Sequence, residues 1–346
     1  GHGAVAVGNV GTPIVAAVAG APAADGADHA AGADPAGGPD VLAVELSSYQ
    51  LHWSDTVAPY AAAVLNVAPD HLDWHGSMES YAADKGKIYA LGGMAIVNAD
   101  DAWSVRLAEG AARTVGFTLG TPAPGQLGVV DGLLVDRAFV ADPANEAVEL
   151  AELHDVRPFA PHNVANALAA AALARAYGVP AEAVREGLRA YRPDPHRNAQ
   201  VATVAKVDYV DDSKATNPHA AAASLAAYES VVWIAGGLLK GADVEDLVRS
   251  RADRLRGAVL LGADRAQIAR ALARHAPNVP VVEVSGIETM SMDDIMDRVV
   301  AAATRLAAPG DTVLLAPAGA SFDMFTDYGA RGDAFAAAVL RLAENR

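Results

Sequence analysis

The sequence predicts an α/β fold with two domains, in which strands and helices alternate along the chain. Short apolar runs are followed repeatedly by helix-like segments, a pattern typical of parallel sheets covered by helices. The alternation is strict from Val201 onward, which indicates a doubly wound second domain. The chain has 346 residues, enough for two domains of ordinary size. We expect a first domain over residues 1–192 and a second over residues 193–346.

The first segment, residues 3–20, is expected to form a short strand, a tight turn and an alanine-rich helix. The turn holds Gly8 and Asn9, and Pro13 suits the start of the helix. Amides exposed at such a turn could receive an anion, although a plain strand-to-helix turn explains the same residues. Residues 20–40 are rich in Gly, Ala, Pro and Asp, so we expect a flexible surface insertion there.

Two apolar runs in the first half are predicted to be buried strands with polar residues at their ends. The run at residues 41–46 carries Glu45, and an acid buried there needs a partner or a metal. The run at residues 61–67 is followed by Asp70 and His71. Because ligands of open α/β sheets bind at the carboxyl ends of the strands, these side chains are candidate site residues.

A helix is expected from Ser77, a suitable N-cap, to Tyr89. It carries Lys85 and Lys87, two of only five lysines in the chain. Carboxylates, an imidazole and a scarce lysine together indicate a metal or phosphate site. The alternative is that the acids shape a turn, His71 lies on the surface and Lys85 is a solvated helix charge.

The rest of the first domain is predicted to contain one more strand–helix unit and two closing helices. The strand covers residues 94–98, and its helix follows Asp100. Short β-like pieces within residues 113–150 are expected to form a small antiparallel addition. Strongly helical patterns cover residues 162–177 and 181–191.

The second domain is predicted to have five strands separated by helices. The expected strands are residues 207–211, 231–235, 258–261, 281–284 and 312–316, and a last helix starts at Arg331. Three of these strands end in polar loops, at residues 211–214, 236–240 and 318–321. Strands of a parallel sheet end at one edge, so we expect the three loops to define a cleft there.

Composition excludes several classes of protein. The formal net charge of −16 argues against binding to nucleic acid or to an anionic membrane surface, because both need basic patches. Without cysteine there is no disulfide, thiolate metal site or nucleophilic thiol. No signal peptide and no long uninterrupted apolar run is visible. We therefore expect a cytoplasmic protein, and a monomer.

Seven sequence blocks resemble the Mur ligases, in the order of that family and over nearly the whole chain. They are ELSSYQL at 45–51, NVAPDHLD at 66–73, YAADKGKIY at 81–89, HNVAN at 162–166, PHR at 195–197, DSKATN at 212–217 and PAGASFD at 317–323. The DSKATN and PAGASFD blocks resemble the family member that adds D-glutamate. The resemblance implies a central nucleotide-binding domain of the ATPase type, followed by a Rossmann-like domain that binds the amino acid.

The resemblance also implies a reaction. D-glutamate would be joined to UDP-N-acetylmuramoyl-L-alanine through an acyl phosphate, with ATP as a substrate and Mg²⁺ as the cofactor, in peptidoglycan precursor synthesis. The family's phosphate loop, G-x-x-x-x-G-K-[ST], does not occur in this sequence. In the family that loop precedes the segment where this chain starts. We therefore expect a truncated first domain, and a chain that makes no product by itself.

The same resemblance suggests the roles of individual residues. It implies that Glu45 and His71 bind metal, that Lys85 is carbamylated and that Lys214 is catalytic. The implied ATP-binding residues are Asn163, Asn166, Arg197 and Asp212. The implied substrate-binding residues are Asn9, Thr216, Lys240, Ser321, Phe322 and Tyr328. Some of these positions have a structural alternative, since His196 beside Arg197 could be a cap and Phe322 and Tyr328 could be core aromatics.

Two other functions fit parts of the sequence. One is a folylpolyglutamate-synthase-like ligase, against which the DSKATN and PAGASFD blocks count. The other is a non-catalytic module that binds a nucleotide and an amino acid. The coding sequence upstream of Gly1 would separate the module from the enzyme, because a phosphate loop there indicates the enzyme.

Overall fold

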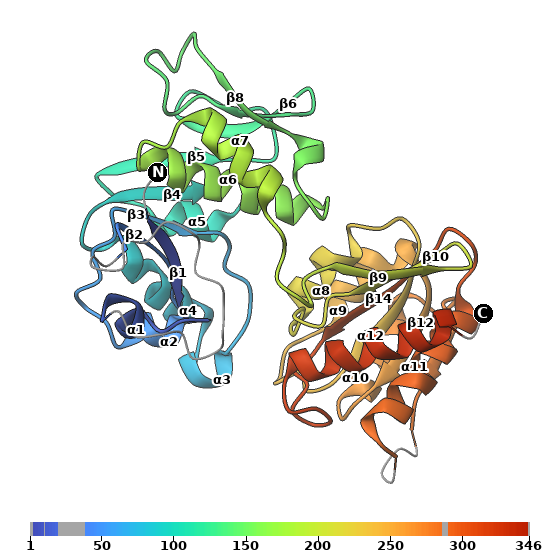
Figure 1. The fold of residues 1–346 in the computed structure, drawn as a ribbon. Coiled ribbons are helices and arrows are strands. Elements are labelled where there is room, and N and C mark those ends of the chain that lie inside the picture. Colours follow the sequence, from blue (N-terminus) through green and yellow to red (C-terminus); the bar gives the residue numbers. More distant parts are fainter. Residues whose placement is uncertain (1–2, 10, 20–38, 286–289, 345–346) are drawn as a thin grey trace.

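The computed structural model describes residues 3–9, 11–19, 39–285 and 290–344. Two six-stranded sheets lie in two units, and a two-stranded sheet accompanies the first unit. The units stand side by side, and the chain crosses between them once, after α7 (Ala181–Ala190) and before β9 (Ala199–Val204) (Figure 1). The insertion expected at residues 20–40 falls almost entirely outside the described residues.

The strands fall into these three sheets. They are β1 (Ala4–Gly8), β2 (Val41–Glu45), β3 (Ala61–Val64), β4 (Met94–Asn98), β5 (Arg113–Phe117), β6 (Gln126–Val130), β7 (Leu133–Asp136), β8 (Val148–Glu152), β9 (Ala199–Val204), β10 (Val207–Asp211), β11 (Val231–Gly236), β12 (Leu255–Leu261), β13 (Val281–Glu283) and β14 (Thr312–Ala318).

The helices cover the sheets. The α-helices are α1 (Ile14–Val18), α2 (Ser48–His52), α3 (Leu72–His75), α4 (Met78–Gly86), α5 (Ala102–Leu107), α6 (Pro161–Ala176), α7 (Ala181–Ala190), α8 (Pro218–Leu225), α9 (Glu245–Arg251), α10 (Arg265–His275), α11 (Met292–Leu306) and α12 (Tyr328–Glu344). Short 3₁₀ turns are η1 (Lys87–Tyr89), η2 (Leu153–Asp155) and η3 (Ala252–Arg254).

The sheet of the first unit runs in the order β3-β4-β5-β6-β7-β8. Alternate residues of β4 serve opposite faces, as the pleat requires: Ile96 packs in the core with α6, and Val97 packs with α4 and α5. The prediction of an antiparallel addition over residues 113–150 was only partly right. β5 and β6 extend the parallel sheet, and only the pairs β6–β7 and β7–β8 are antiparallel.

The strand predicted around Glu45 forms, but the prediction that it is buried was wrong. β2 pairs in parallel with β1, and its last three residues are exposed. Val44 keeps 43% of its surface accessible. An apolar run shows that a strand can be buried, whereas burial itself depends on the layers around it. Among the described residues, these two strands form a sheet of their own.

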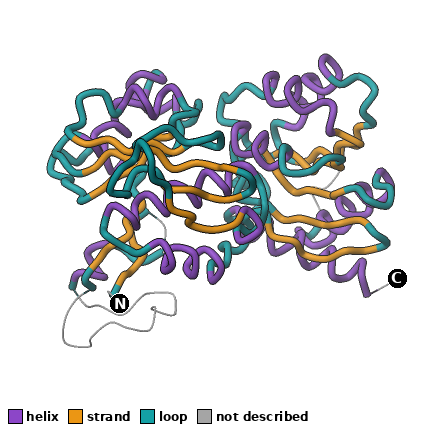
Figure 2. The backbone as a smooth tube through the Cα atoms, turned by 90° about the horizontal axis from the view of Figure 1, so that it is seen from above, coloured by secondary structure: helices purple, strands orange, loops and turns teal. Residues whose placement is uncertain are grey.

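The sheet of the second unit runs in the order β13-β12-β11-β14-β10-β9. All five predicted strands are present and parallel. β9 was not predicted from the sequence; it forms an antiparallel hairpin with β10 and makes the sheet six-stranded. The β9–β10 turn needs positive φ at Ala205 and Lys206, and neither is a residue that signals such a turn. From above, helices lie on both sides of the strands (Figure 2).

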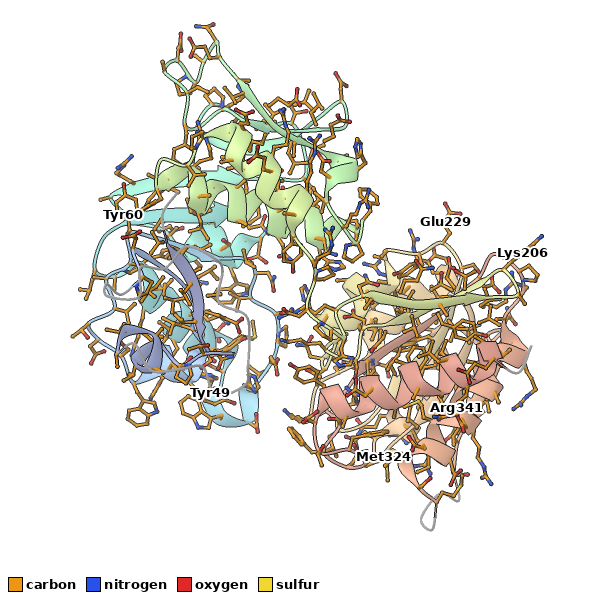
Figure 3. The ribbon with its side chains drawn as sticks, viewed as in Figure 1. Tyr49, Tyr60, Lys206, Glu229, Met324 and Arg341 are labelled. Carbon is orange, nitrogen blue, oxygen red and sulfur yellow. The ribbon has the colours of Figure 1, made fainter. Side chains whose placement is uncertain are left out.

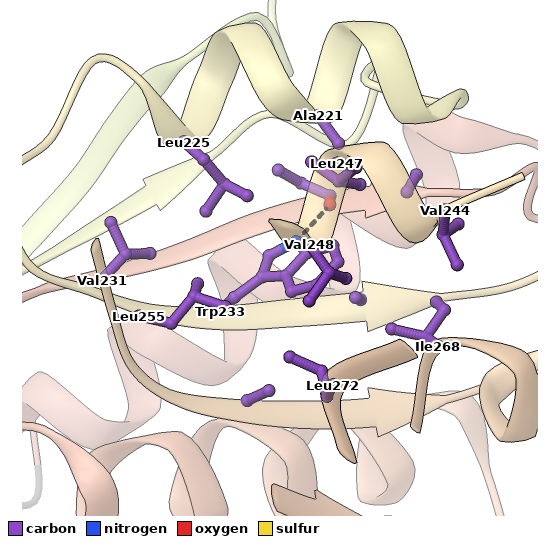
Figure 4. Close-up of a cluster of buried hydrophobic side chains, with 14 of the residues drawn as sticks. Ala221, Leu225, Val231, Trp233, Val244, Leu247, Val248, Leu255, Ile268 and Leu272 are labelled. Atoms are coloured by element: carbon purple, nitrogen blue, oxygen red, sulfur yellow. Dashed lines mark hydrogen bonds between the residues drawn. The ribbon is translucent and has the colours of Figure 1, made fainter. Parts of the chain in front are cut away.

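Two apolar cores hold this second sheet between its helices. Helices α8, α9 and α10 pack on one face, around the fully buried Trp233. The Trp233 indole N–H donates to the carbonyl of Ala316, 2.7 Å away, so the ring is buried without leaving its donor unpaired (Figure 4). Helices α11 and α12 pack on the other face through residues such as Val299 and Phe335. The unit therefore has the doubly wound layers that the sequence predicts.

Among the described residues, no helix is long and apolar enough to cross a membrane.

Candidate active site

The ends of β1 and β2 bring Asn9 and Glu45 together. The two strands are parallel and in register, so Gly8 lies opposite Glu45. The Asn9 side-chain amide donates to Oε1 of Glu45 at 3.2 Å, and its backbone N–H donates to the Glu45 carbonyl at 2.8 Å. Gly8 has φ +128°, and a Cβ there would lie 2.1 Å from that carbonyl oxygen. The close approach of the two strand ends therefore requires a glycine at this position.

The loop after β3 presents Asp70 and His71. The backbone N–H of His71 donates to Oδ1 of Asp70 at 2.9 Å, and its Nδ1 lies 3.6 Å from the same oxygen. His71 adopts a left-handed φ of 53° as it enters α3. Its ring meets the ring of Tyr49, a residue of α2 labelled in Figure 3, with centroids 5.1 Å apart. His71 is therefore partly packed, and is more than a surface residue.

Lys85 lies on α4, and its ammonium sits over the ring of Tyr81, 5.0 Å from the ring centroid. The helix begins as expected, with the Ser77 hydroxyl accepting from the N–H of Ser80. Burial lowers the pKa of Lys85, and the negative charges of Asp70 and Glu45 act in the opposite direction. Both carboxylates are thus near enough for their negative charges to act on the amine, which makes Asp70 a further candidate beside the predicted Glu45 and Lys85.

Lys87 serves a different purpose. Its ammonium donates to the carbonyl of His52 at 2.6 Å and lies 3.6 Å from Asp55 and 3.9 Å from Asp84. These contacts tie η1 to the end of α2. The resemblance gives a role to Lys85 and none to Lys87, and the two ammonium groups have different surroundings.

The residues at this place fit Mg²⁺ only in part. Within the described ranges, no group of three or more His, Asp or Glu side chains is placed to hold a metal ion. Mg²⁺, however, commonly takes one or two carboxylates and fills its other positions with water and phosphate oxygens. Glu45 and Asp70 satisfy that need, but the charged form of Lys85 does not. A carbamate on Lys85 would turn a repelling cation into an oxygen ligand.

A buried chain of polar side chains beneath this place was missed by the sequence analysis. Ser48 Oγ lies 3.0 Å from His75 Nε2, and His75 Nδ1 lies 3.0 Å from Oδ2 of Asp84. His52 Nδ1 lies 2.9 Å from the same carboxylate oxygen. The His75 side chain is fully buried. These four residues, the Asp84 cluster, join α2, α3 and α4, and no spacing along the sequence would indicate them.

In the second unit, the three predicted polar loops meet around a buried arginine. Strands β10, β14 and β11 are neighbours, so their carboxyl ends lie at one edge. The guanidinium of Arg331 donates to the hydroxyl and the carbonyl of Ser213 and to the carbonyl of Gly319. Leu238 and Ala320 pair as a β-bridge, which joins the other two loops. Burial lowers the pKa of Arg331 to about 10.

Arg331 was predicted only as the start of a helix. The sequence offered one sign of this role, a single arginine among small and apolar residues at the start of α12. Arg331 is buried, and a buried guanidinium needs several acceptors. These contacts tie the three loops together at the edge where the cleft was predicted. Two other hollows on the surface lie beside Met324 and Phe325 and beside Tyr60 and Met94.

His196 and Arg197 have different surroundings. His196 takes a left-handed φ of 63°, and its Nδ1 lies 2.6 Å from Oδ2 of Asp211. This contact favours a structural role for His196. Its ring is fixed by the hydrogen bond with Asp211, and it does not cap a helix. Arg197 keeps 42% of its side chain exposed, with Asp194 3.5 Å away. Its guanidinium can therefore still reach a ligand.

Asp212 lies near Arg197 and is only partly accessible to solvent. Its Oδ1 accepts from the backbone N–H of Asn198 at 3.1 Å. Burial raises the pKa of Asp212 to about 6, with a further increase from Asp211 and an opposing effect of Arg197. A shifted acid at a strand end is a candidate for binding a ligand.

The remaining predicted substrate residues lie on the three loops. Lys214 lies over the ring of Tyr328, 5.2 Å from its centroid, and the N–H of Thr216 donates to the Lys214 carbonyl. Ser321 is buried, whereas Phe322 is 67% exposed. The core alternative for Phe322 is therefore wrong. Lys240 is exposed and has a φ of 51°.

Asn163 and Asn166 lie near the start of α6, as expected. The Asn163 amide donates to the carbonyl of Pro158 at 2.9 Å, and Asn166 is exposed. The two units also touch directly, because the Asn217 amide donates to Oδ2 of Asp70 at 3.1 Å. This hydrogen bond connects the DSKATN loop to the loop of His71.

Comparison with known families gives two adjoining matches. The family model described as the Mur ligase middle domain matches residues 24–174. The model described as the Mur ligase glutamate ligase domain matches residues 196–319. The boundary between the two matches lies in the segment that joins the two six-stranded sheets.

Curated relatives match nearly the whole chain. A UDP-N-acetylmuramoylalanine–D-glutamate ligase of Thermobifida fusca is 63% identical over 347 residues, covering 99% of this chain and 71% of the relative. A protein of the same name from Streptomyces coelicolor is 61% identical and covers 97% and 69%.

Solved structures share the fold at low identity. A pseudomurein peptide ligase type C from Methanothermus fervidus has a TM-score of 0.64 and 15% identity, covering 89% of this chain and 69% of that one. The MurF ligase of Thermotoga maritima, solved in complex with ADP, has a TM-score of 0.59 and 17% identity, covering 90% and 69%.

Proposed function

The chain belongs to the Mur ligase family, and from this premise we propose that it serves the ATP-dependent ligation of D-glutamate to UDP-N-acetylmuramoyl-L-alanine. The carboxylate of the acceptor takes the γ-phosphoryl group of ATP, and ADP leaves. The amine of D-glutamate then attacks the acyl phosphate, the amide bond forms and phosphate leaves. The product is a peptidoglycan precursor.

The observation that carries this function is the position of Lys85. A partly buried amine with a lowered pKa, near Glu45 and Asp70, is suited to react with CO₂, because only the neutral amine is nucleophilic. The nitrogen forms a bond to carbon, a proton is released and a carbamate results. Glu45 would then hold one Mg²⁺, and His71 with the carbamate would support a second. When bound, Mg²⁺ offsets the negative charge on the phosphates during transfer.

We assign the nucleotide to residues on both sides of the junction between units. Exposed Asn166 and half-exposed Arg197 are free to contact base and phosphate, and Asp212 suits a ribose hydroxyl. Asn163 takes part through its position beside Asn166, although its amide already bonds to Pro158.

We assign D-glutamate to the loops at the edge of the second sheet. Its carboxylates need a cation and hydroxyls, which Lys240, Thr216 and Ser321 provide. Lys214 and Tyr328 lie together at the same edge and complete the pocket, with Phe322 at its exposed side. Asn9 faces the UDP-sugar substrate from the first unit.

We propose further that the domains divide near residue 192, that the protein acts in the cytoplasm and that it is a monomer. The division is supported by the single crossing of the chain between the two sheets. The location is supported by the substrates, since ATP and UDP-sugars are made in the cytoplasm.

The test is phosphate release with all three substrates. We would assay this chain and a chimera that adds the part of the Thermobifida fusca relative outside the match. The chimera should release phosphate only when ATP, D-glutamate and UDP-N-acetylmuramoyl-L-alanine are all present. L-glutamate and D-alanine should fail to replace D-glutamate.

Two outcomes would support the other functions. Binding of ADP without any ligation by the chimera would indicate a non-catalytic module. Ligation of L-glutamate to a folate acceptor would indicate a folylpolyglutamate-synthase-like enzyme. The names of the relatives count against the second outcome.

A further inference from the structure

Helix α8 lies on the side of the second unit that faces the first unit (Figure 1). Asn217, its N-cap, uses both ends of its side-chain amide. The carbonyl Oδ1 accepts from the N–H of Ala220 at 2.8 Å, which caps the helix. The NH₂ group donates to Oδ2 of Asp70 at 3.1 Å, across 147 residues of sequence.

Asp70 is shared in the same way. Its Oδ1 accepts from the backbone N–H of His71, while its Oδ2 accepts from Asn217. The charge of Asp70 also acts on the pKa of Lys85. One carboxylate thus contacts the second unit, orients the His71 loop and faces the lysine of the candidate metal site.

A second contact supports the docking of α8. His162, in the first turn of α6, is partly buried beside α8. Burial is the main reason that the pKa of His162 is lowered, and the backbone of Ala223 and the ring of His219, both in α8, also act on that pKa. Helix α8 therefore lies close to the first unit at its N-cap and again near Ala223.

Capping alone does not explain the choice of asparagine. Asp and Ser cap a helix about as well as Asn does. Of these three residues, however, only Asn can cap with its oxygen and still offer an NH₂ donor to a carboxylate. The contact with Asp70 is the feature that needs the amide.

We propose that Asn217 is a positioning residue, which docks the amino-acid loop at residues 212–217 onto the Asp70–His71 loop. Through this hydrogen bond, the loop that carries Lys214 and Thr216 is held facing the site of Lys85. The roles of these loops rest on the proposed function, whereas the docking itself does not.

The test changes the helix cap and the hydrogen bond to Asp70 separately. Asn217→Ser keeps the cap and removes the hydrogen bond to Asp70. Asn217→Asp keeps the cap and places a carboxylate against Asp70. The double variant Asp70→Asn with Asn217→Asp restores the bond with donor and acceptor exchanged, since Asn at position 70 can donate to Asp at position 217.

The first readout is the distance between the units. Because the chain has no cysteine, Glu109→Cys and Arg270→Cys, both exposed positions in different units, can be labelled with a donor and an acceptor dye. Asn217→Asp and Asn217→Ser should widen the distribution of dye separations, with unfolding midpoints close to that of the parent. The double variant should return the distribution to that of the parent.

The second readout is turnover of the chimera. In Asn217→Asp, kcat should fall about tenfold or more, as expected for loss of a hydrogen bond to a charged group, with KM for ATP unchanged. Unchanged dye separations in both single variants, or a double variant whose dye separations stay as wide as those of Asn217→Asp, would overturn the docking. A docked chimera that makes no product would instead count against the proposed function.

Discussion

Burial lowers the pKa of Lys85, whereas Lys87, with only one residue between them, is held by the carbonyl of His52 and by Asp55 and Asp84. Lys85→Ala should abolish ligation by the chimera, because the carbamate would be lost. Short carboxylates such as acetate, added at high concentration, should restore part of the activity by replacing the missing oxygen ligands. Steady-state rates with and without acetate measure this effect.

Lys87→Ala is the matched control. That variant should lose some stability, because Lys87 pairs with Asp55 and Asp84, and it should show no response to acetate. Full activity of Lys85→Ala without any additive would show that the carbamate has been assigned to the wrong residue.

Amino-acid selection should depend on Lys240 and Ser321. Replacing either residue by alanine should weaken D-glutamate use by about 1.5–3 kcal/mol, the range for hydrogen bonds to charged groups, with little change in ATP affinity. KM for D-glutamate and the Kd for ADP measure the two effects. Lys206→Ala is a matched control, since Lys206 is another exposed lysine with positive φ. An equal loss of nucleotide affinity would place Lys240 and Ser321 in the ATP site.

Asp212 should make stability depend on pH. Its folded pKa of about 6 lies above the ordinary value of 3.8, so the native state holds the proton more tightly than the unfolded state does. That contribution is complete below pH 3.8 and is lost as the pH rises through 6. Compared with Asp212→Asn, the parent should therefore lose roughly 3 kcal/mol of stability between pH 4 and pH 7.

Urea unfolding at several pH values measures this difference. Asp253→Asn, at an exposed carboxylate, serves as the control and should show little such trend. If the difference in unfolding free energy between the parent and Asp212→Asn is the same at every pH, Asp212 is not shielded from water in the native state.

At the scale of elements, three short helices depend on one carboxylate. Asp84 accepts from His52 and His75, and His75 in turn contacts Ser48. Asp84→Asn keeps an oxygen that can accept from both imidazoles but loses the charge that strengthens these bonds and pairs with Lys87, so it should lower the unfolding free energy of the first unit by about 2 kcal/mol. Asp55→Asn is the control, because Asp55 is an exposed partner of Lys87 and should cost less than about 1 kcal/mol. Equal losses would mean that the Asp84 cluster adds no stability.

Helices and strands were predicted best where the local sequence pattern matches the burial that the sheet gives them. The strands of the second unit read as continuous apolar runs because helices cover both faces, and all five were found. The exposure of β2 could not be predicted, since residues 41–45 are equally apolar in either setting. The hairpin β9–β10 lacks the usual turn residues, so its first strand was missed.

Site residues were predicted where a block of sequence supplies both the residue and its neighbours. Glu45 and Asn9 do meet, and the charge of Glu45 does act on the amine of Lys85. Arg331, the Asp84 cluster and the bond from Asn217 to Asp70 involve partners far apart in sequence. Nothing local marks such pairs, because the fold alone brings them together.

At the scale of the whole molecule, the second unit should fold without the first. Its two cores are built entirely from its own strands and helices. A fragment of residues 193–346 should unfold in one cooperative transition, followed by circular dichroism in urea. Ile234→Asp in that fragment should abolish the transition, because it buries a charge, and Leu340→Asp at an exposed site should not. A fragment without a transition would mean that the second unit needs the first.

The place of β14 has a consequence for how the protein is made. This strand is the last of the sheet in sequence, yet it lies between β10 and β11. On the ribosome, β9–β10 and β11–β13 therefore emerge as two groups that share no hydrogen bonds in the finished sheet. They remain apart until residues 312–318 leave the exit tunnel. Through most of its translation, the second unit therefore has apolar strands that are not yet paired into one sheet. Chaperones would protect it from aggregation during this period.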